Sequence, residues 1–191
     1  MSTITIFGDG NMGTAIAGIA TTGGASVQAI TTATPPATIE GDLVVLAVPY
    51  PALATIAASY GPQLAGKVVV DITNPLDFQT FDALTVPAGS SATAELAELL
   101  PESKVLKAFN TTFAATLATG VTGSLPTTVL VAGDDAEAKQ TLIGVVKAGG
   151  LDALDVGSLK RAHELEALGF LQLTLAIAGS LPWTGGFAVA K

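Results

Sequence analysis

The chain has 191 residues, of which only 13% are charged, and its 8 Lys and Arg against 16 Asp and Glu give a net charge of −8. Its first Lys or Arg is Lys67, which excludes the clustered cations of a nucleic-acid site or a polybasic membrane anchor. Absent cysteine and a single histidine exclude disulfides, thiol catalysis and Cys-based or His-rich metal sites, so no metal site is predicted.

Predicted strands and helices alternate along the chain. Alternating or continuous apolar runs predict strands at residues 3–7, 26–30, 43–48, 67–72, 104–109, 127–132 and, as an edge strand, 151–156. Helices are predicted at residues 14–20, 51–60, 92–100, 136–148 and 159–181, with a short one after Thr112. Strands that alternate with helices predict an α/β fold with a doubly wound, mainly parallel sheet.

A glycine-rich turn lies between the first strand and the first helix. Its sequence is Gly8-Asp9-Gly10-Asn11-Met12-Gly13, the Gly-x-Gly-x-x-Gly spacing of a Rossmann dinucleotide site. The first glycine permits the tight turn, the second lets a pyrophosphate approach the backbone, and the third lets the helix pack closely. The helix N-terminus then offers free N–H groups to the phosphates. A glycine turn without a ligand is the alternative interpretation.

The end of the second strand decides which nicotinamide cofactor such a site prefers. An NAD site places Asp or Glu there, whereas an NADP site places Arg nearby. This chain has Thr31 and Thr32, whose hydroxyls can bond to a ribose or to a 2′-phosphate, although both can also be ordinary loop residues.

Three more strand ends fall on the edge where open α/β sheets bind ligands. They are Ala47-Val48-Pro49, Asn74-Pro75 after Thr73, and the segment from Lys107 through Ala108 to Asn110. Asn74 can donate or accept a hydrogen bond with a ribose or a carboxamide. Each proline can alternatively serve only to end its strand.

Taken together, these segments resemble the coenzyme F420-dependent NADP reductase family, which includes the reductase domain of FAD-using metalloreductases. The segments that carry the resemblance are Phe7–Gly13, Ala47–Pro49, Asp71–Pro75, Lys107–Thr111, Gly133–Asp135, and Asp155–Leu159 with Glu164–Glu166. The resemblance implies an NADP-binding Rossmann domain over residues 1–158, with a C-terminal helix and tail over 159–191 that pack on it or at a dimer interface. It also implies a homodimer and hydride transfer between nicotinamide and a flavin- or deazaflavin-like ring.

Two departures from the family pattern bear on the cofactor. Asp9 stands where the family commonly has Thr, and Thr31-Thr32 stand where it commonly has Ser-Arg. A 2′-phosphate would lose an attractive charge and gain a repulsive one, whereas Asp9 can bond to a ribose hydroxyl. The resemblance therefore implies NADP, while the local charges favour NAD or a relaxed specificity.

No catalytic side chain is identified from the sequence, because hydride transfer between stacked rings needs positioning more than acid–base groups. His163 can line a pocket or lie on a solvated helix surface, and Lys107 can polarise a carbonyl or be a structural surface lysine. Trp183 and Phe187 can cover a flat ring or pack at a subunit contact. The alternatives in function are a dinucleotide-binding sensor without turnover and a small carbonyl or imine reductase, for which Tyr50, Lys107 or His163 would have to donate the proton.

The C-terminal helix is apolar but too short to cross a membrane. Its apolar part, residues 167–181, has about 15 residues where a span needs about 20. We expect a buried or interface helix, a homodimer, a cytoplasmic protein, a small planar acceptor as partner, and neither nucleic acid nor a membrane.

Overall fold

The computed structural model describes residues 3–33 and 37–190 of the chain. Seven strands form one sheet in the order β2-β1-β3-β4-β5-β8-β9, and a separate hairpin pairs β6 with β7. The strands of the large sheet are β1 (Thr3–Phe7), β2 (Ser26–Ile30), β3 (Leu43–Leu46), β4 (Val68–Asp71), β5 (Lys104–Lys107), β8 (Thr128–Gly133) and β9 (Asp152–Gly157). The hairpin strands are β6 (Val121–Thr122) and β7 (Leu125–Pro126).

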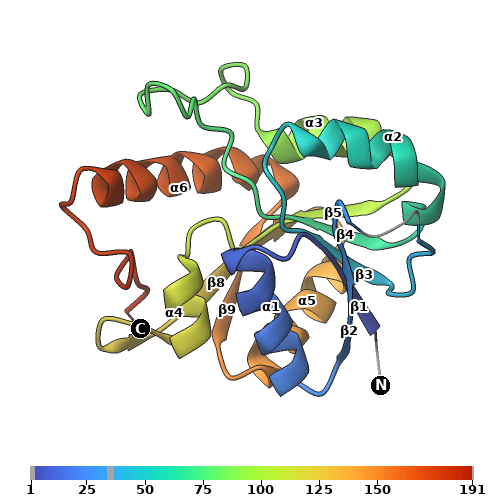
Figure 1. Cartoon of the computed structure of the whole chain (residues 1–191), viewed down its shortest axis with the longest axis horizontal. Coiled ribbons are helices and arrows are strands. Elements are labelled where there is room, and N and C mark those ends of the chain that lie inside the picture. Colours follow the sequence, from blue (N-terminus) through green and yellow to red (C-terminus); the bar gives the residue numbers. More distant parts are fainter. Residues whose placement is uncertain (1–2, 34–36, 191) are drawn as a thin grey trace.

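Strands β1 to β5 run parallel, β8 runs antiparallel to β5, and the edge strand β9 runs parallel to β8. The helices are α1 (Asn11–Thr22), α2 (Ala52–Leu64), α3 (Ala92–Leu99), α4 (Ala114–Thr119), α5 (Ala136–Ala148) and α6 (Ala162–Ile177). Helices α1, α4 and α5 lie on one side of the sheet, whereas α2 and α3 lie on the other (Figure 1). The predicted doubly wound, mainly parallel α/β fold is therefore confirmed.

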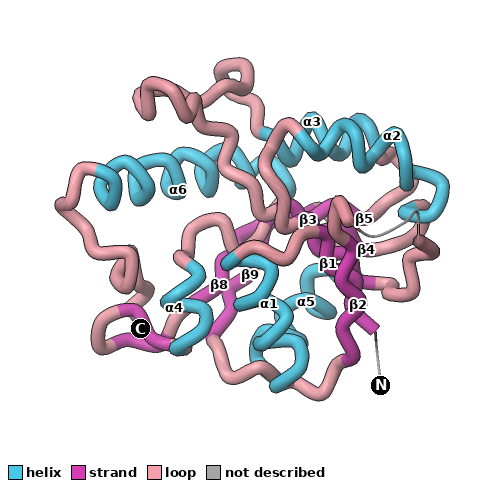
Figure 2. The backbone as a smooth tube through the Cα atoms, viewed as in Figure 1, coloured by secondary structure: helices cyan, strands magenta, loops and turns pink. Residues whose placement is uncertain are grey.

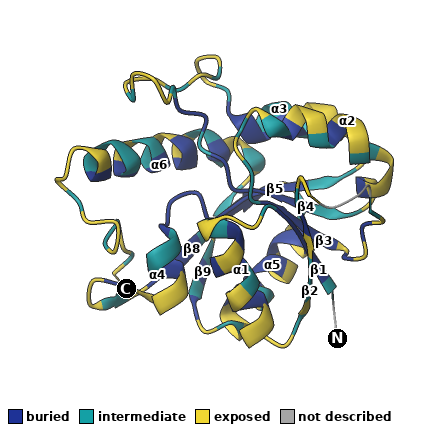
Figure 3. Ribbon diagram, viewed as in Figure 1, coloured by how far each residue is buried: buried dark blue, intermediate teal, exposed yellow. Residues whose placement is uncertain are grey.

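The hydrophobic core has two parts, one on each face of the sheet. Along β3, Leu43 and Val45 face the part formed with α1, α4 and α5, whereas Val44 and Leu46 face the part formed with α2 and α3. This alternation follows from the two-residue period of a strand, and it explains why the run is apolar throughout. Figure 3 shows the buried residues gathered in the sheet and on the helix sides that face it.

The boundaries of several elements differ from the sequence predictions. The strands expected at 43–48, 67–72 and 104–109 end at Leu46, Asp71 and Lys107, because the chain turns away from the ladder to form the loops of the sheet edge. The helix expected at 51–60 continues to Leu64 and contains Pro62. The helix expected at 159–181 is a 3₁₀ turn followed by α6, which ends before Gly179, a residue in the left-handed conformation (φ 74°) that commonly terminates helices. The hairpin β6–β7 was not predicted.

A long loop leads from β4 to α3 and extends past α6, away from the sheet (Figure 2). Helix α6 itself lies beside α3, and the tail that follows α6 returns towards α4 and the hairpin (Figure 1). Within residues 3–33 and 37–190, no helix combines the length and the apolar character that crossing a membrane requires.

Candidate functional site

The glycine turn after β1 has a fixed shape with an open centre. Gly8 has φ 97°, and a Cβ there would lie 2.2 Å from the Ala47 carbonyl oxygen. A Cβ on Gly13 would lie 2.2 Å from the Gly8 carbonyl oxygen, so both glycines are required by internal packing. A Cβ on Gly10 would meet no atom of the described residues within 4 Å. The middle glycine therefore leaves open space in front of the backbone, where a ligand can approach.

The N-terminus of α1 opens onto this turn. The helix begins at Asn11, its N-cap residue is Gly10, and no side chain caps its first N–H groups. The first turn of α1 contains no acidic residue. Uncapped N–H groups and the positive end of the helix dipole together favour an anion at this position.

Two cavities lie on either side of the turn. We call the first the outer cavity; it has a volume of about 590 Å³ and lies between the turn and α2. Of the predicted site residues, it is lined by Gly8, Asp9, Gly10, Thr31, Thr32, Ala47, Val48 and Pro49. Among the described residues that line the outer cavity, Asp9 is the only Asp or Glu, and there is no Lys or Arg.

We call the second the amide cavity; it has a volume of about 350 Å³ and lies between the N-terminus of α1, the ends of β4 and β5, and α6. Of the predicted site residues, it is lined by Asn11, Met12, Asn74 and Asn110. Its other lining residues are Ile72, Thr112, Phe113, Ala114, Ala115, Leu173 and Trp183. Pro75 and Ala108, which were also predicted to bind the cofactor, line neither cavity.

The side chains of Asn74 and Asn110 form an interlocked pair beside the amide cavity. Asn110 Nδ2 donates to Asn74 Oδ1 at 2.9 Å and to the Leu165 carbonyl oxygen at 2.8 Å. In return, Asn74 Nδ2 donates to the Asn110 carbonyl oxygen at 2.8 Å. These bonds fix the plane of the Asn74 amide, which is half-buried and reaches the cavity. Asn110 Oδ1 is buried without a hydrogen-bond partner among the described residues.

Two backbone features hold the amide pair in place. Phe109, directly before Asn110, is buried in the left-handed conformation with φ 63°, which costs a non-glycine residue about 1–2 kcal/mol. Gly169 of α6 lies so close that a Cβ there would be 2.4 Å from Asn74 Oδ1. A strained residue persists only where its surroundings impose the strained conformation. The packing at the end of β5 therefore fixes the backbone of Phe109 and, with it, the position of Asn110.

A buried ion cluster lies behind the amide pair and joins β4, β5 and α6. Lys107 Nζ lies 2.9 Å from Asp71 Oδ2 and 2.8 Å from Glu166 Oε1, and it also donates to the Thr73 carbonyl oxygen at 2.5 Å. The Thr93 hydroxyl donates to Asp71 Oδ2 at 2.7 Å. Since the Lys107 side chain is 0% exposed, the interpretation of Lys107 as a surface lysine was wrong, and it cannot reach a substrate carbonyl.

Glu166 also caps a helix from a distance. Its carboxylate accepts from the Ala92 N–H at 2.9 Å and from the Thr93 N–H at 3.3 Å, the first two residues of α3. Burial raises the pKa of the Glu166 carboxyl, against the opposing attraction of Lys107. Sequence reasoning missed this cluster; its one local signal was Asp71, a single charged residue inside an otherwise apolar strand segment.

The candidate proton donors Tyr50 and His163 lie outside the amide cavity, whereas the tail residue Trp183 lines it. Tyr50 donates to Glu95 Oε2 at 2.5 Å, and this hydrogen bond raises the pKa of Tyr50 to about 12. His163 Nδ1 lies 2.9 Å from the Ser90 carbonyl oxygen and is half-buried, so it is not a freely solvated surface residue. Neither they nor Lys107 line the amide cavity, and a proton donor for a carbonyl or imine reductase is therefore not found among these three.

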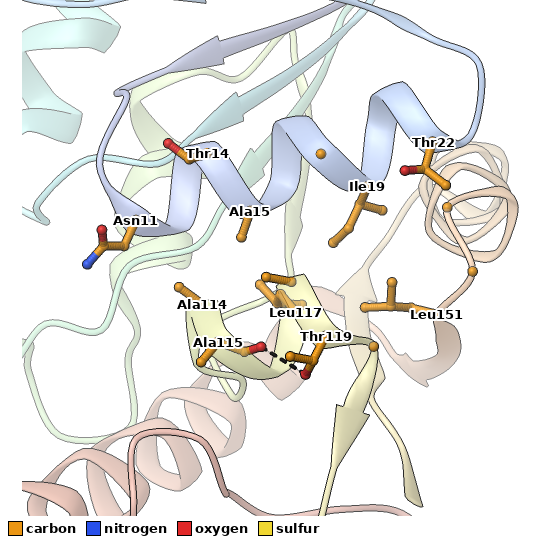
Figure 4. A pocket seen from close by; sticks show the side chains of 15 residues that line it. Asn11, Thr14, Ala15, Ile19, Thr22, Ala114, Ala115, Leu117, Thr119 and Leu151 are labelled. Atoms are coloured by element: carbon orange, nitrogen blue, oxygen red, sulfur yellow. Dashed lines mark hydrogen bonds between the residues drawn. The ribbon is translucent and has the colours of Figure 1, made fainter.

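A further groove of about 730 Å³ lies between α1 and α4 (Figure 4). It is lined mainly by Ala, Gly and Thr side chains such as Thr14, Ala15 and Ala115, and Asn11 is the predicted site residue that reaches it. It contains no ionisable side chain among its lining residues, and it shares Asn11, Ala114 and Ala115 with the amide cavity but is not lined by Asn74 or Asn110. We therefore place the candidate site at the outer and amide cavities.

Comparison with known proteins identifies the family of the chain. Residues 25–75 match the family described as NADP oxidoreductase, coenzyme F420-dependent. The F420-dependent NADP reductase of Methanocaldococcus jannaschii is 32% identical over 150 residues, which cover 76% of this chain and 67% of that enzyme. Metalloreductase STEAP3 of Rattus norvegicus is 38% identical over 110 residues. These residues cover 58% of this chain but only about a fifth (21%) of the rat protein.

The fold is also shared with a solved structure. A crystal structure from Arthrobacter sp. FB24, provisionally described as an F420-dependent NADP reductase, is 27% identical, covers 100% of both chains and has a TM-score of 0.86. The resemblance predicted from the motifs is confirmed, and the chain belongs to the family of coenzyme F420-dependent NADP oxidoreductases.

Proposed function

We propose that the chain binds a nicotinamide dinucleotide across the glycine turn and passes its hydride to a flavin- or deazaflavin-like ring. The observation that carries this proposal is the position of Gly10, whose open face lies at the N-terminus of α1 with one cavity on each side. A dinucleotide has two nucleosides joined by a pyrophosphate, and this arrangement offers a place for each of the three parts.

The chain's own residues have separate tasks in this proposal. The N–H groups at Gly10–Gly13 hold the pyrophosphate, and the outer cavity takes the adenosine. The Asn74 amide, which reaches the cavity and is held in its plane by Asn110, orients the carboxamide. The reduced nicotinamide supplies a hydride, which is two electrons and one proton, to the acceptor ring, and water supplies any second proton. The side chains of the amide cavity position the rings, and none of them takes part in an acid–base step.

We propose a relaxed cofactor specificity in which NADH binds at least as well as NADPH. The lining residues of the outer cavity include Asp9 and no Lys or Arg, so a 2′-phosphate would meet an anion without a compensating cation. The 2′-hydroxyl of NADH can instead donate a hydrogen bond to the Asp9 carboxylate.

Calorimetric titration with NADH and with NADPH tests both proposals, followed by a screen of FMN, FAD and coenzyme F420 as acceptors. We expect the two dissociation constants to differ by less than about tenfold or to favour NADH. A preference for NADPH of a hundredfold or more would overturn the relaxed specificity, and failure to bind either would overturn the dinucleotide site itself. Tight binding with no turnover on any acceptor would favour the sensor alternative.

We propose that the C-terminal segment, residues 159–191, works as part of the same unit and that its outer side contacts a second copy of the chain. Glu166 and Gly169 of α6 take part in the ion cluster and the amide pair, whereas Leu171 and Ile177 of the same helix are about half exposed, at 50% and 45%. Exposed apolar side chains on a helix are typical of an interface. Light scattering that gives only the 19.0 kDa monomer would contradict the dimer.

A further inference from the structure

Trp183 occupies an unusual position in the tail that follows α6. It lies outside any helix or strand and its side chain is 52% exposed, yet it forms part of the wall of the amide cavity. Its ring lies against Phe113 with a centroid distance of 4.9 Å and an interplanar angle of 53°. An aromatic pair therefore forms one wall of a cavity whose other members include two amides.

The tail is fastened where it carries this tryptophan. Gln172 of α6 is only 1% exposed, and its Oε1 accepts from the Phe187 N–H at 3.0 Å. Between these anchors the chain makes a turn in which the Gly185 N–H donates to the Pro182 carbonyl oxygen at 2.9 Å. A Cβ on Gly186, which has φ 140°, would lie 3.0 Å from Gln172 Oε1. A buried polar side chain thus holds a segment whose tryptophan remains exposed.

The two ends of the amide cavity differ in what they can bind. Asn11 and Met12 lie at the glycine turn, which is where a pyrophosphate would bring in the nicotinamide. Leu173 and Trp183 belong to α6 and the tail, on the side away from that turn. A group that lines the side of Trp183 therefore meets the second reactant rather than the nicotinamide. An indole face attracts flat, electron-poor rings through offset stacking.

We propose that Trp183 is a stacking wall for the planar acceptor and that Gln172 is the positioning residue that holds this wall in place. The proposal rests on the proposed function, since it assigns the acceptor side of the same cavity. The ring class that it selects is a flavin or deazaflavin, whose tricyclic face matches an indole better than a small aliphatic carbonyl does.

The test compares Trp183→Ala, Trp183→Phe and Gln172→Ala with the wild-type chain, using NADH as donor and FMN or coenzyme F420 as acceptor. We expect Trp183→Ala to raise the acceptor KM about tenfold, in keeping with loss of an aromatic stack, while the NADH dissociation constant stays unchanged. Trp183→Phe restores part of the loss. Phe78→Ala is the matched control, because Phe78 is 62% exposed and lines neither cavity, and it should leave the acceptor KM unchanged.

The chain has one tryptophan, which gives a second readout that does not depend on turnover. With NAD⁺ bound, we expect FMN to quench the Trp183 emission saturably, and Gln172→Ala to shift that emission to the red and to raise the acceptor KM. If the acceptor KM of Trp183→Ala stays within twofold of the wild-type value, the proposal is overturned. It is also overturned if Trp183→Ala changes from dimer to monomer in light scattering while its acceptor KM is unchanged. Intact NADH binding without saturable FMN or F420 binding would also overturn it, whereas absence of NADH binding would overturn the proposed function itself.

Discussion

The ammonium of Lys107 lies 2.8 Å from the carboxylate of Glu166, although the two residues are 59 positions apart and both side chains are buried. Lys107 ends a central strand and Glu166 lies in the helix that crosses beyond it. With Asp71 the cluster has two carboxylates for one ammonium, so its charges balance only if one carboxylate holds a proton or other donors compensate. The N–H groups of Ala92 and Thr93 supply such donors.

Replacing Lys107 with Met should destabilise the fold strongly. The change leaves two carboxylates without their shared cation, and breaking a buried pair in this way costs about 3–5 kcal/mol. Urea unfolding followed by circular dichroism measures the loss. The control is Lys104→Met in the same strand, whose partner Asp135 is partly exposed (side chain 33%), and the free energy of unfolding should change far less. Equal effects of the two variants would contradict a special role for the cluster.

The pH dependence of stability should reveal Glu166. Its pKa is raised by burial above the ordinary value of 4.5, so the folded state binds this proton more tightly than the unfolded state does. The contribution of Glu166 to stability is therefore complete below pH 4.5 and declines as the pH rises through the raised pKa. The measurement is the difference in unfolding free energy between the wild type and Glu166→Gln from pH 4 to pH 8. The unfolding free energy of the wild type minus that of Glu166→Gln should fall as the pH rises, and a rise in this quantity would contradict the sign.

Two glycine substitutions separate ligand binding from folding. Gly10→Ala places a methyl group in space that no atom of residues 3–33 and 37–190 occupies. The backbone angles at Gly10, φ −67° and ψ −176°, are ones that alanine adopts readily. We expect unchanged thermal stability and a dissociation constant for NADH that rises about ten- to hundredfold, as when a charge-assisted hydrogen bond is lost. Calorimetry and a thermal melt measure the two quantities.

The control for this pair is Gly18→Ala within α1. Its Cβ also meets nothing within 4 Å, but it lies in the middle of the helix, where alanine is favoured by about 1 kcal/mol. It should therefore raise the stability without changing the affinity for NADH. Because Gly18 lines the groove between α1 and α4, a loss of activity in this variant would instead point to that groove.

Removing the charge of Asp9 should change the choice of cofactor. Asp9→Asn keeps the shape of the side chain, and at water-like screening a unit charge at ~4 Å is worth about 1 kcal/mol, or about fivefold in affinity. We expect the ratio of NADPH to NADH affinity to rise by about that factor, measured by calorimetry at low salt. An unchanged ratio would indicate that Asp9 does not face the ribose, and Asp42→Asn, at a fully exposed carboxylate that lines neither cavity, is the control.

Sequence reasoning located the parts of the candidate site that are local in the chain, and their binding roles stay predictions. The glycine spacing predicted the turn after β1, and Asn74 and Asn110 were found because they follow apolar strands that end at one sheet edge. Strand and helix types were correct for the same reason, since they depend on periods of two and 3.6 residues. Whether Pro75 and Ala108 contact a cofactor stays a prediction.

The parts that were not recovered depend on distant packing. Lys107 was interpreted as a surface residue or a substrate contact, because charged side chains are rarely buried unless they are paired. Its two carboxylate partners lie on different elements. No local sequence pattern predicts that α6 passes over the end of β5. The Phe113–Trp183 contact likewise joins the residue before α4 to a tail without regular structure. These contacts follow from the path of α6 rather than from any residue's neighbours in the chain.

The lack of cations around the outer cavity also affects the kinetics of binding. A chain with a net charge of −8 repels an anionic dinucleotide at a distance, and no basic patch lines the described site to attract it. Added salt screens that repulsion, so the association rate should increase with ionic strength, opposite to the usual trend for phosphate ligands. Salt weakens binding mainly where a phosphate pairs with lysine or arginine. If backbone N–H groups hold the phosphate instead, the affinity for the cofactor should change little in concentrated salt.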